Sequence, residues 1–168
     1  MSLLFTFRGI PCIYYGSEVE FQKGTAIDEG PNIALADSGR AYYGDYLEGT
    51  VSATGFGTYS ASGKVKQTLE STLSQHLQML NRIRLQVPAL RRGQYTSVGN
   101  LAFVRRYTAK GVDSVACVTI SGGTTFTGLP GGTYKDMVNN RTFTIGNGGS
   151  INVNYVSGRG NLAILVRQ

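Results

Sequence analysis

The sequence of 168 residues contains a single histidine and only two cysteines, which limits the metal sites that it can form. A Cys/His zinc cluster is excluded because His76 is the one imidazole available. Cys12 and Cys117 each lie within an apolar run, which favours two small buried core residues. A disulfide between them is compatible with the sequence but is not implied by it. We expect His76 to flank an apolar helical stripe rather than to act as a catalyst.

Long apolar runs are also absent. No stretch approaches the roughly 20 residues that a membrane-spanning helix needs, so we expect no membrane partner. The first residues, MSLLFTF, are too short for a signal peptide and lack its small-residue cleavage site. The sequence therefore predicts no localisation, and a secreted and a cytoplasmic protein both stay open.

Charged residues make up only 15% of the chain, whereas hydrophobic residues make up 41%, so a core can form and wholesale disorder is not expected. The charges are unevenly spread. Residues 1–70 hold 5 basic and 8 acidic residues, and residues 71–168 hold 11 basic and 2 acidic ones. A basic half can indicate nucleic-acid binding. The arginines are scattered, however, and no zinc-finger or RNP motif is present, so we expect no nucleic-acid partner.

Three kinds of segment follow one another in the first half. The apolar run Ile10–Tyr15 predicts a buried strand, and Pro11 is tolerated because it stands near the strand's start. Residues 16–62 form a long irregular zone, which is often functional when it occurs in a compact domain. Apolar residues at steps of three and four between Val65 and Val87 predict one amphipathic helix. We expect Ser62 to cap this helix and Pro88 to end it near residue 86.

From Gln94 onward, short apolar runs alternate with turn signals such as KGVD and GNGG. This pattern predicts an antiparallel β-sandwich over residues 94–168. The predicted strands lie in LAFVRRY (101–107), SVACVTI (114–120), GTYKDMV (132–138), RTFTI (141–145), SINVNYV (150–156) and NLAILVR (161–167). We interpret SGGTTFTGLPGG (121–132) as turns and not as a phosphate loop, because it lacks the Lys-Ser/Thr ending of a Walker A sequence.

A buried strand, a long loop and a helix together make one βα unit of a parallel α/β fold. One strand cannot form a parallel sheet, so the sequence predicts that the strand's partners lie outside this chain. In α/β barrels the loop after such a strand lies at the end of the barrel where active sites are built.

The segment FRGIPCIYYGSE (7–18) resembles the eighth-strand motif of the α-amylase family of glycoside hydrolases, a Gly-x-Pro run that ends in Tyr-Tyr-Gly-x-Glu. LNRIRLQVPALRRGQY (80–95) is similar to the end of that family's last barrel helix and the lead-in to its C-terminal domain. GTYKDMVNNRTFTI (132–145) resembles strands of that domain. The resemblance implies that residues 1–93 are a β-loop-α part of a (β/α)8 catalytic barrel. It also implies that residues 94–168 are the all-β C-terminal sandwich.

The resemblance implies a parent enzyme that cleaves glycosidic bonds of α-glucans such as starch or maltooligosaccharides. A retaining glycosidase needs two carboxyl groups about 5 Å apart across the scissile bond. The family carries its catalytic carboxylates on the fourth, fifth and seventh barrel strands, and none of those motifs is present here. We therefore predict no catalytic residue in this chain, which alone is expected to be inactive and structural. Whether the parent is a hydrolase or a glucanotransferase stays open.

Aromatic and acidic residues near the strand end are the candidates for sugar contacts, because aromatic faces stack on sugar rings and carboxylates accept hydrogen bonds from hydroxyls. They are Tyr15, Glu18, Tyr42, Tyr43 and Tyr46. Two structural alternatives stay open: a loop that folds on its own tyrosines, and a Glu18 that bonds to backbone or to an arginine. No cofactor is predicted. Asp28, Glu29 and Asp37 offer oxygen ligands of the kind that calcium prefers, so calcium stays open for the parent.

A non-catalytic carbohydrate-binding or interaction module is the alternative function, although such a module would not need IPCIYYGSE. The isolated strand also has a physical consequence, because an unpaired apolar edge pairs readily with another chain. We therefore expect either self-association through residues 1–93 or a rearrangement that leaves Ile10–Tyr15 outside any parallel sheet.

Overall fold

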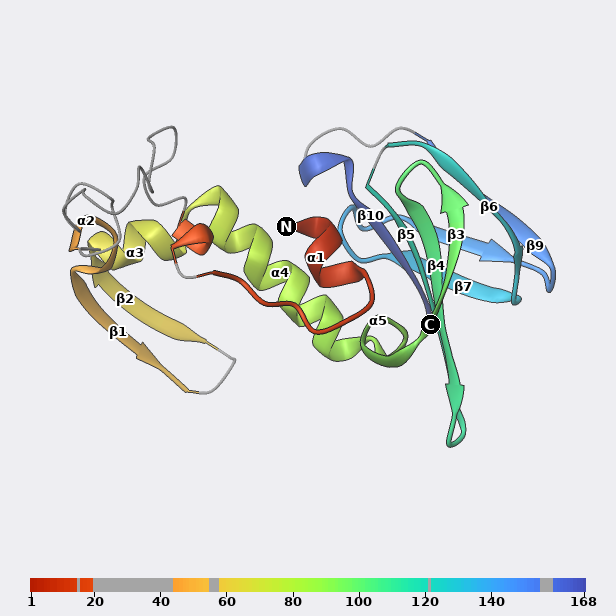
Figure 1. Ribbon diagram of the computed structural model, residues 1–168, viewed down its shortest axis with the longest axis horizontal. Coiled ribbons are helices and arrows are strands. Elements are labelled where there is room, and N and C mark those ends of the chain that lie inside the picture. Colours follow the sequence, from red (N-terminus) through yellow and green to blue (C-terminus); the bar gives the residue numbers. More distant parts are fainter. Residues whose placement is uncertain (15, 20–43, 55–57, 121, 155–158) are drawn as a thin grey trace, which may run out of the picture. The chain divides into compact units, whose positions relative to one another are not determined.

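The computed structural model describes residues 1–14, 16–19, 44–54, 58–120, 122–154 and 159–168 (Figure 1). The chain divides into two compact units. The first joins Met1–Pro11 to Met79–Gln168, and the second is Cys12–Gln78. Each unit is described by itself below.

The first unit is built on an antiparallel six-stranded sheet with the order β3-β4-β5-β10-β7-β8. Its strands are β3 (Gln94–Gly99), β4 (Ala102–Ala109), β5 (Val112–Thr119), β7 (Gly132–Asp136), β8 (Thr142–Ile145) and β10 (Ala163–Arg167). The strands β6 (Thr124–Leu129) and β9 (Gly149–Val153) pair with each other in a second sheet. A 3-10 turn, η2 (Arg159–Asn161), precedes β10.

Tight turns set the register of the first hairpins. β4 and β5 pair from Ala102↔Thr119 to Ala109↔Val112, so Lys110 and Gly111 alone make the turn. Both have positive φ, 53° and 77°, as a type I′ turn requires. The turn signal KGVD is thereby confirmed as a hairpin.

Apolar side chains of the two sheets meet in one core. Its buried members come from β4, β5, β6, β7, β9 and β10: Ala102, Val115, Cys117, Phe126, Leu129, Tyr134, Ile151, Val153, Ala163 and Leu165. Because successive strand residues point to opposite faces, this set occupies one face of the large sheet. The fold class predicted from the sequence is therefore confirmed: a mainly antiparallel β part follows an N-terminal helical and β region.

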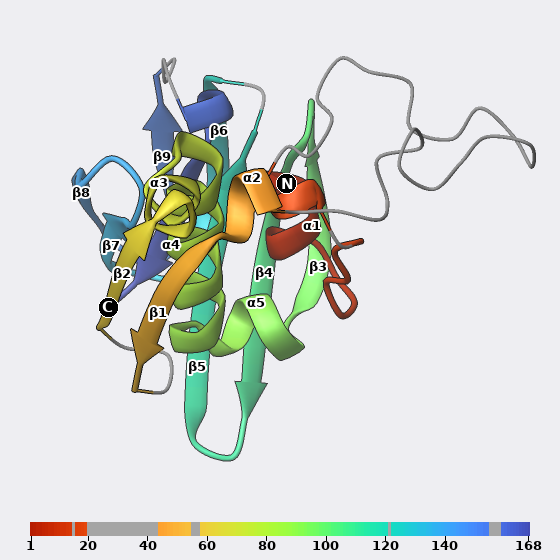
Figure 2. The ribbon, with the colours of Figure 1, turned by 90° about the vertical axis from the view of Figure 1, so that its left-hand side faces the viewer.

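The opposite face of the large sheet is also covered. Phe103, Val118 and Ile164 alternate with the core residues and are at most 1% exposed. Helix α5 (Pro88–Arg92) contacts β4 and β5, and the Ala89 amide donates a hydrogen bond to Ser114 Oγ (3.2 Å). Figure 2 shows α5 beside these two strands. A short N-terminal helix, α1 (Ser2–Thr6), is tied to the same face because Arg105 Nη1 of β4 donates to the Thr6 carbonyl (3.1 Å).

In the first unit each of the six predicted strand runs overlaps a strand, but two strands of this unit, β3 and β6, were not predicted. β6 lies in the stretch that was interpreted as turns, and this interpretation was wrong at Thr124–Leu129. β3 was missed because its sequence has no apolar run, which is the usual sequence signal of a strand. In the structure almost all of its residues are exposed. Phe126 and Leu129 are the only buried residues of β6, and they stand three residues apart because the register with β9 shifts between them, so no period-two alternation marks this strand.

The second unit contains η1 (Ser17–Val19), α2 (Gly44–Leu47), the hairpin β1 (Gly49–Ala53) and β2 (Tyr59–Gly63), and α3 (Lys64–Leu69). β1 and β2 are antiparallel, and α3 contacts both strands. Figure 1 shows the hairpin next to α3. The described part of the irregular zone is thus partly ordered into a helix and a hairpin.

The predicted single helix is two helices, α3 and α4 (Thr72–Gln86). They separate at Ser71, whose Oγ accepts a hydrogen bond from the Ser74 amide (3.2 Å) as an N-cap does. Ser62 does not cap α3, because it belongs to β2 and its hydroxyl bonds to that of Thr50 (2.7 Å). The cap is Gly63, with φ 72°. The predicted end of the helix before Pro88 is confirmed.

The predicted strand Ile10–Tyr15 is not formed at its described residues, 10–14. Ile10 is 94% exposed and Tyr14 is 62% exposed. An extended segment needs a neighbouring strand to satisfy its backbone groups, and none of the described strands pairs with these residues. Residues 10–14 therefore lie outside the sheets that the structure describes, and self-association and the rearrangement both stay predictions. Cys12 is exposed and Cys117 is buried, so the prediction of a buried residue was wrong for Cys12 and right for Cys117.

Within the described residues, none of the helices combines the length and the apolar character that crossing a bilayer requires.

Candidate functional site

The segment that was expected to carry sugar-binding residues makes a tight turn. The Ser17 amide donates to the Tyr14 carbonyl (3.1 Å), and Gly16 is buried with φ 87°, which a residue with a side chain rarely adopts. Glu18 follows in η1 and is exposed to solvent. The glycine of the motif therefore serves the turn, and Glu18 is accessible to a ligand.

Tyr46 is the other described member of the predicted set. It is half-buried in α2, and its carbonyl accepts a hydrogen bond from Thr68 Oγ1 of α3 (2.7 Å). Tyr15, Tyr42 and Tyr43 lie outside the described residues, as do Asp28, Glu29 and Asp37. The assignment of these residues to sugar or calcium binding stays a prediction. No group of three or more His, Cys, Asp or Glu residues suited to a metal ion occurs in the described part of the chain.

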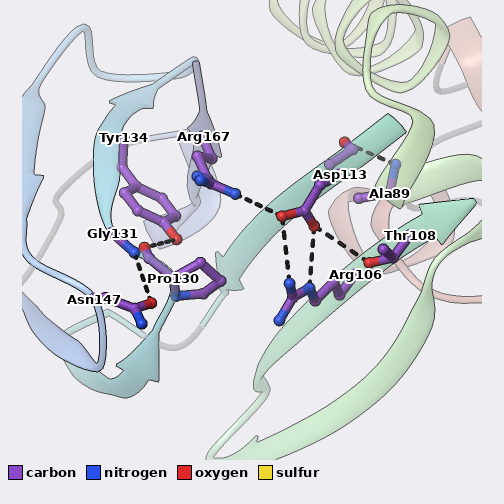
Figure 3. Close-up of polar contacts among 10 residues, drawn as sticks. Ala89, Arg106, Thr108, Asp113, Pro130, Gly131, Tyr134, Asn147 and Arg167 are labelled. Atoms are coloured by element: carbon purple, nitrogen blue, oxygen red, sulfur yellow. Dashed lines mark hydrogen bonds and ion pairs between the residues drawn. The ribbon is translucent and has the colours of Figure 1, made fainter. Parts of the chain in front are cut away.

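A polar network that the sequence did not reveal lies on the β4–β5 hairpin (Figure 3). Arg106 Nε and Nη2 donate to the two carboxylate oxygens of Asp113 (3.1 and 3.3 Å), and Arg167 Nη1 of β10 donates to Oδ2 (2.7 Å). Thr108 Oγ1 donates to Oδ1 (3.3 Å). The hydrogen bond from Arg106, with a further one from Arg167, holds the pKa of the Asp113 carboxyl below its usual value. A carboxylate held in this way is unsuited to act as a general acid.

Asp136 is the second carboxylate of this unit and is fully buried at the end of β7. Its Oδ1 accepts from the amides of Val138 and Asn139 (3.1 and 3.2 Å). Its Oδ2 accepts from Asn139 Nδ2 (2.9 Å) and from Arg141 Nε and Nη2 (3.0 and 2.8 Å). All of these partners belong to the β7–β8 connection, so Asp136 organises a turn and does not face a ligand.

Two buried arginines bind backbone carbonyls. Arg84 of α4 donates from Nη1 to Phe5 and Leu90 (2.8 and 2.9 Å) and from Nη2 to Gly9. Arg105 donates from Nε and Nη2 to Gly93 (3.1 and 2.9 Å). Burial, with repulsion from nearby arginines, lowers the pKa of both guanidinium groups. These contacts fasten the N-terminal segment to the body of the unit.

Comparison with known proteins identifies the fold. No family model matches the sequence, and no curated protein does. Among solved structures, an α-amylase from Anoxybacillus matches 99% of this chain with a TM-score of 0.58 and 20% identity. An α-amylase from Geobacillus thermoleovorans, solved with acarbose, matches 100% with a TM-score of 0.53 and 17% identity. The protein AmyP, solved with maltotriose, matches 99% with a TM-score of 0.55 and 16% identity.

The chain spans about a third of the length of these proteins: 30%, 32% and 33%, respectively. At such identities the likeness concerns the fold alone. The structure therefore has the fold of a segment of an α-amylase, and the resemblance seen in the sequence is confirmed at that level.

Proposed function

We propose that this chain is the C-terminal portion of an α-amylase-type enzyme that acts on α-glucans. The observation that carries the proposal is the match of almost the whole chain to about a third of two α-amylases. The motif FRGIPCIYYGSE (7–18) supports it independently, because a free-standing sandwich has no need of a barrel strand. Residues 1–93 would then contribute to the barrel and residues 94–168 would form the C-terminal domain.

Within this proposal the chain alone is structural and not catalytic. Glycoside hydrolysis needs a pair of carboxyl groups that reach the scissile bond from both sides. In the first unit Asp113 and Asp136 are each bonded to arginine, and Asp136 is buried among its own turn residues. Glu18 and Tyr46, with Tyr15, Tyr42 and Tyr43, would contact the sugar in the complete enzyme.

The test is an assay of the purified chain on soluble starch, from a host strain that lacks amylase. We expect no release of reducing sugar above the level of a mock purification. The companion measurement is a calorimetric titration with maltoheptaose, for which we expect no saturable binding, because under this proposal the rest of the sugar-binding site would come from the remainder of the enzyme. Steady turnover would contradict the absence of catalytic residues. Micromolar binding without turnover would favour the alternative, a carbohydrate-binding module.

A further inference from the structure

The turn signal GNGG contains the one Asn-Gly pair of the sequence, Asn147-Gly148. An asparagine followed by glycine is chemically labile, because the next backbone nitrogen can attack the side-chain amide carbon and glycine has no side chain to hinder the approach. The pair lies in the connection between β8 and β9, and Asn147 is exposed to solvent. This reactive pair has no part in the proposed function.

The attacking nitrogen is held by a hydrogen bond in the folded chain. The Gly148 amide donates to the carbonyl of Leu129 at the end of β6 (2.8 Å). The Gly149 amide donates to the Gly146 carbonyl (3.1 Å), and Gly148 has a φ of 77°, as the third position of a type II turn requires. To attack, the Gly148 nitrogen must lose the proton that it donates and turn away from Leu129. The reaction therefore requires this turn to open.

Asn147 is held as well, by the connection between β6 and β7. Its Oδ1 accepts a hydrogen bond from the Gly131 amide (3.4 Å), as Figure 3 shows. A Cβ added at Gly131 would lie 2.8 Å from the Asn147 nitrogen and 3.1 Å from the Gly146 carbonyl carbon. The two connections are thus in direct backbone contact, which leaves little space for an additional main-chain atom at Asn147.

We propose that Asn147 is a site of spontaneous deamidation, which the folded turn protects and which reacts only when this turn opens. In the open turn the Gly148 nitrogen forms a bond to Cγ of Asn147. The proton from that nitrogen and the side-chain amino group leave together as ammonia. Water then opens the cyclic imide at one of its two carbonyl carbons, which yields aspartate or isoaspartate. Nothing is oxidised or reduced, and water is the only co-reactant.

The two products should differ in their effect on the fold. Aspartate keeps the backbone unchanged, and its carboxylate can accept the hydrogen bond from the Gly131 amide. Isoaspartate carries the main chain through the side-chain carbons, which inserts an atom where Gly131 touches the turn. A turn that contains isoaspartate could not close in its original geometry. This inference does not depend on the proposed enzymatic role.

The experiment incubates the full chain at mildly alkaline pH, folded in buffer and unfolded in guanidinium chloride. Mass spectrometry with fragmentation follows the tryptic peptide 142–159, in which Asn152 and Asn154 are internal controls. We expect Asn147 to be the first of the three asparagines to deamidate in the unfolded chain. In the folded chain its rate should be lower by about tenfold or more, because only the open fraction of the turn reacts.

Gly131→Ala tests the contact that holds the turn. The new Cβ would displace the turn, so the rate in the folded variant should rise toward the rate in the unfolded chain. The matched control is Gly146→Ala, where an added Cβ has no atom within 4 Å, and its folded rate should equal that of the parent chain. Incubations are run well below the melting temperature of each variant. If Gly131→Ala does not fold, the comparison of the folded and unfolded parent chain still decides.

The two products are compared by thermal melts. Asn147→Asp should melt at the temperature of the parent chain, whereas the isoaspartate form, separated from an aged and refolded sample, should melt at a lower temperature. A lower melting temperature of Asn147→Asp alone would contradict this account of the products.

Equal rates in the folded and unfolded chains would overturn the proposal. A faster reaction in the folded chain would overturn it too, since the Gly131 amide would then be stabilising the charge that develops on the reacting oxygen. The same holds for an unfolded chain in which Asn147 is stable, and for equal acceleration by Gly131→Ala and Gly146→Ala.

Discussion

At the scale of single residues, two aspartates show how burial decides what a carboxylate contributes. Removing Asp136 would leave Arg141 and two backbone amides without their acceptor inside the protein. We expect Asp136→Ala to lower the free energy of unfolding by about 2–3 kcal/mol, because buried amides lose their acceptor while Arg141, which is partly exposed, can turn to water. Asp113→Ala removes an exposed network, and we expect a loss of about 0–1 kcal/mol. Urea titrations of both variants measure the difference, and equal losses would contradict the argument from burial.

The two cysteines allow a second test at this scale. Burial raises the pKa of the Cys117 thiol to about 12, whereas Cys12 is exposed. A thiol reagent at neutral pH should therefore label one cysteine in the native protein and both after unfolding. The Cys12→Ser variant should show no native labelling, and rapid native labelling of that variant would contradict the burial of Cys117.

The raised pKa of the Cys117 thiol also determines how the stability of the protein changes with pH. Because the thiol of Cys117 is held neutral in the folded state, the unfolded chain loses this proton first as pH rises. The contribution to stability is complete below about pH 9 and declines as the pH rises toward 12. In Cys117→Ala this part of the alkaline decline should be smaller than in the parent chain, as measured by urea titrations at several pH values.

At the scale of elements, the position of the N-terminal segment depends on Arg84 of α4, which is distant in the sequence. Arg84→Leu would leave the carbonyls of Phe5 and Leu90 without this donor, and we expect a loss of about 1–3 kcal/mol. Hydrogen exchange at the Phe5 and Phe7 amides should accelerate more than exchange in β5. Arg82→Leu, an exposed neighbour on α4, is the matched control and should leave these amides unchanged. Uniform acceleration throughout the unit would argue against a local fastening role.

At the scale of the whole molecule, the predicted domain boundary can be tested by truncation. We expect residues 94–168 to fold alone, because the sandwich carries its own strands, turns and core. Residues 79–168 should melt at a higher temperature, since α5 covers β4 and β5. Each large apolar side chain that loses such cover forfeits about 1.5–3 kcal/mol. Calorimetry measures the melting temperatures of the two truncated chains. Identical values would show that the helices covering β4 and β5 add no stability.

Local sequence patterns were sufficient to predict six of the eight strands of the first unit, the end of α4 and the resemblance to an enzyme family. These features depend on local information: apolar alternation, glycine turns such as Lys110-Gly111, and the position of Pro88. The prediction that Cys117 is buried was also right, because this residue stands in the middle of an apolar run on a central strand. Residues adjacent in the sequence were sufficient to predict each of these features.

Whether Ile10–Tyr14 forms a strand depends on tertiary contacts, because a strand needs hydrogen-bonding partners that sequence periodicity cannot supply. The same holds for β6, whose pairing with β9 orders a segment with the composition of a turn. The networks around Asp113 and Arg84 join residues 54 and 79 positions apart. Such contacts have no local signature, since they depend on the folded backbone bringing distant groups within hydrogen-bond distance.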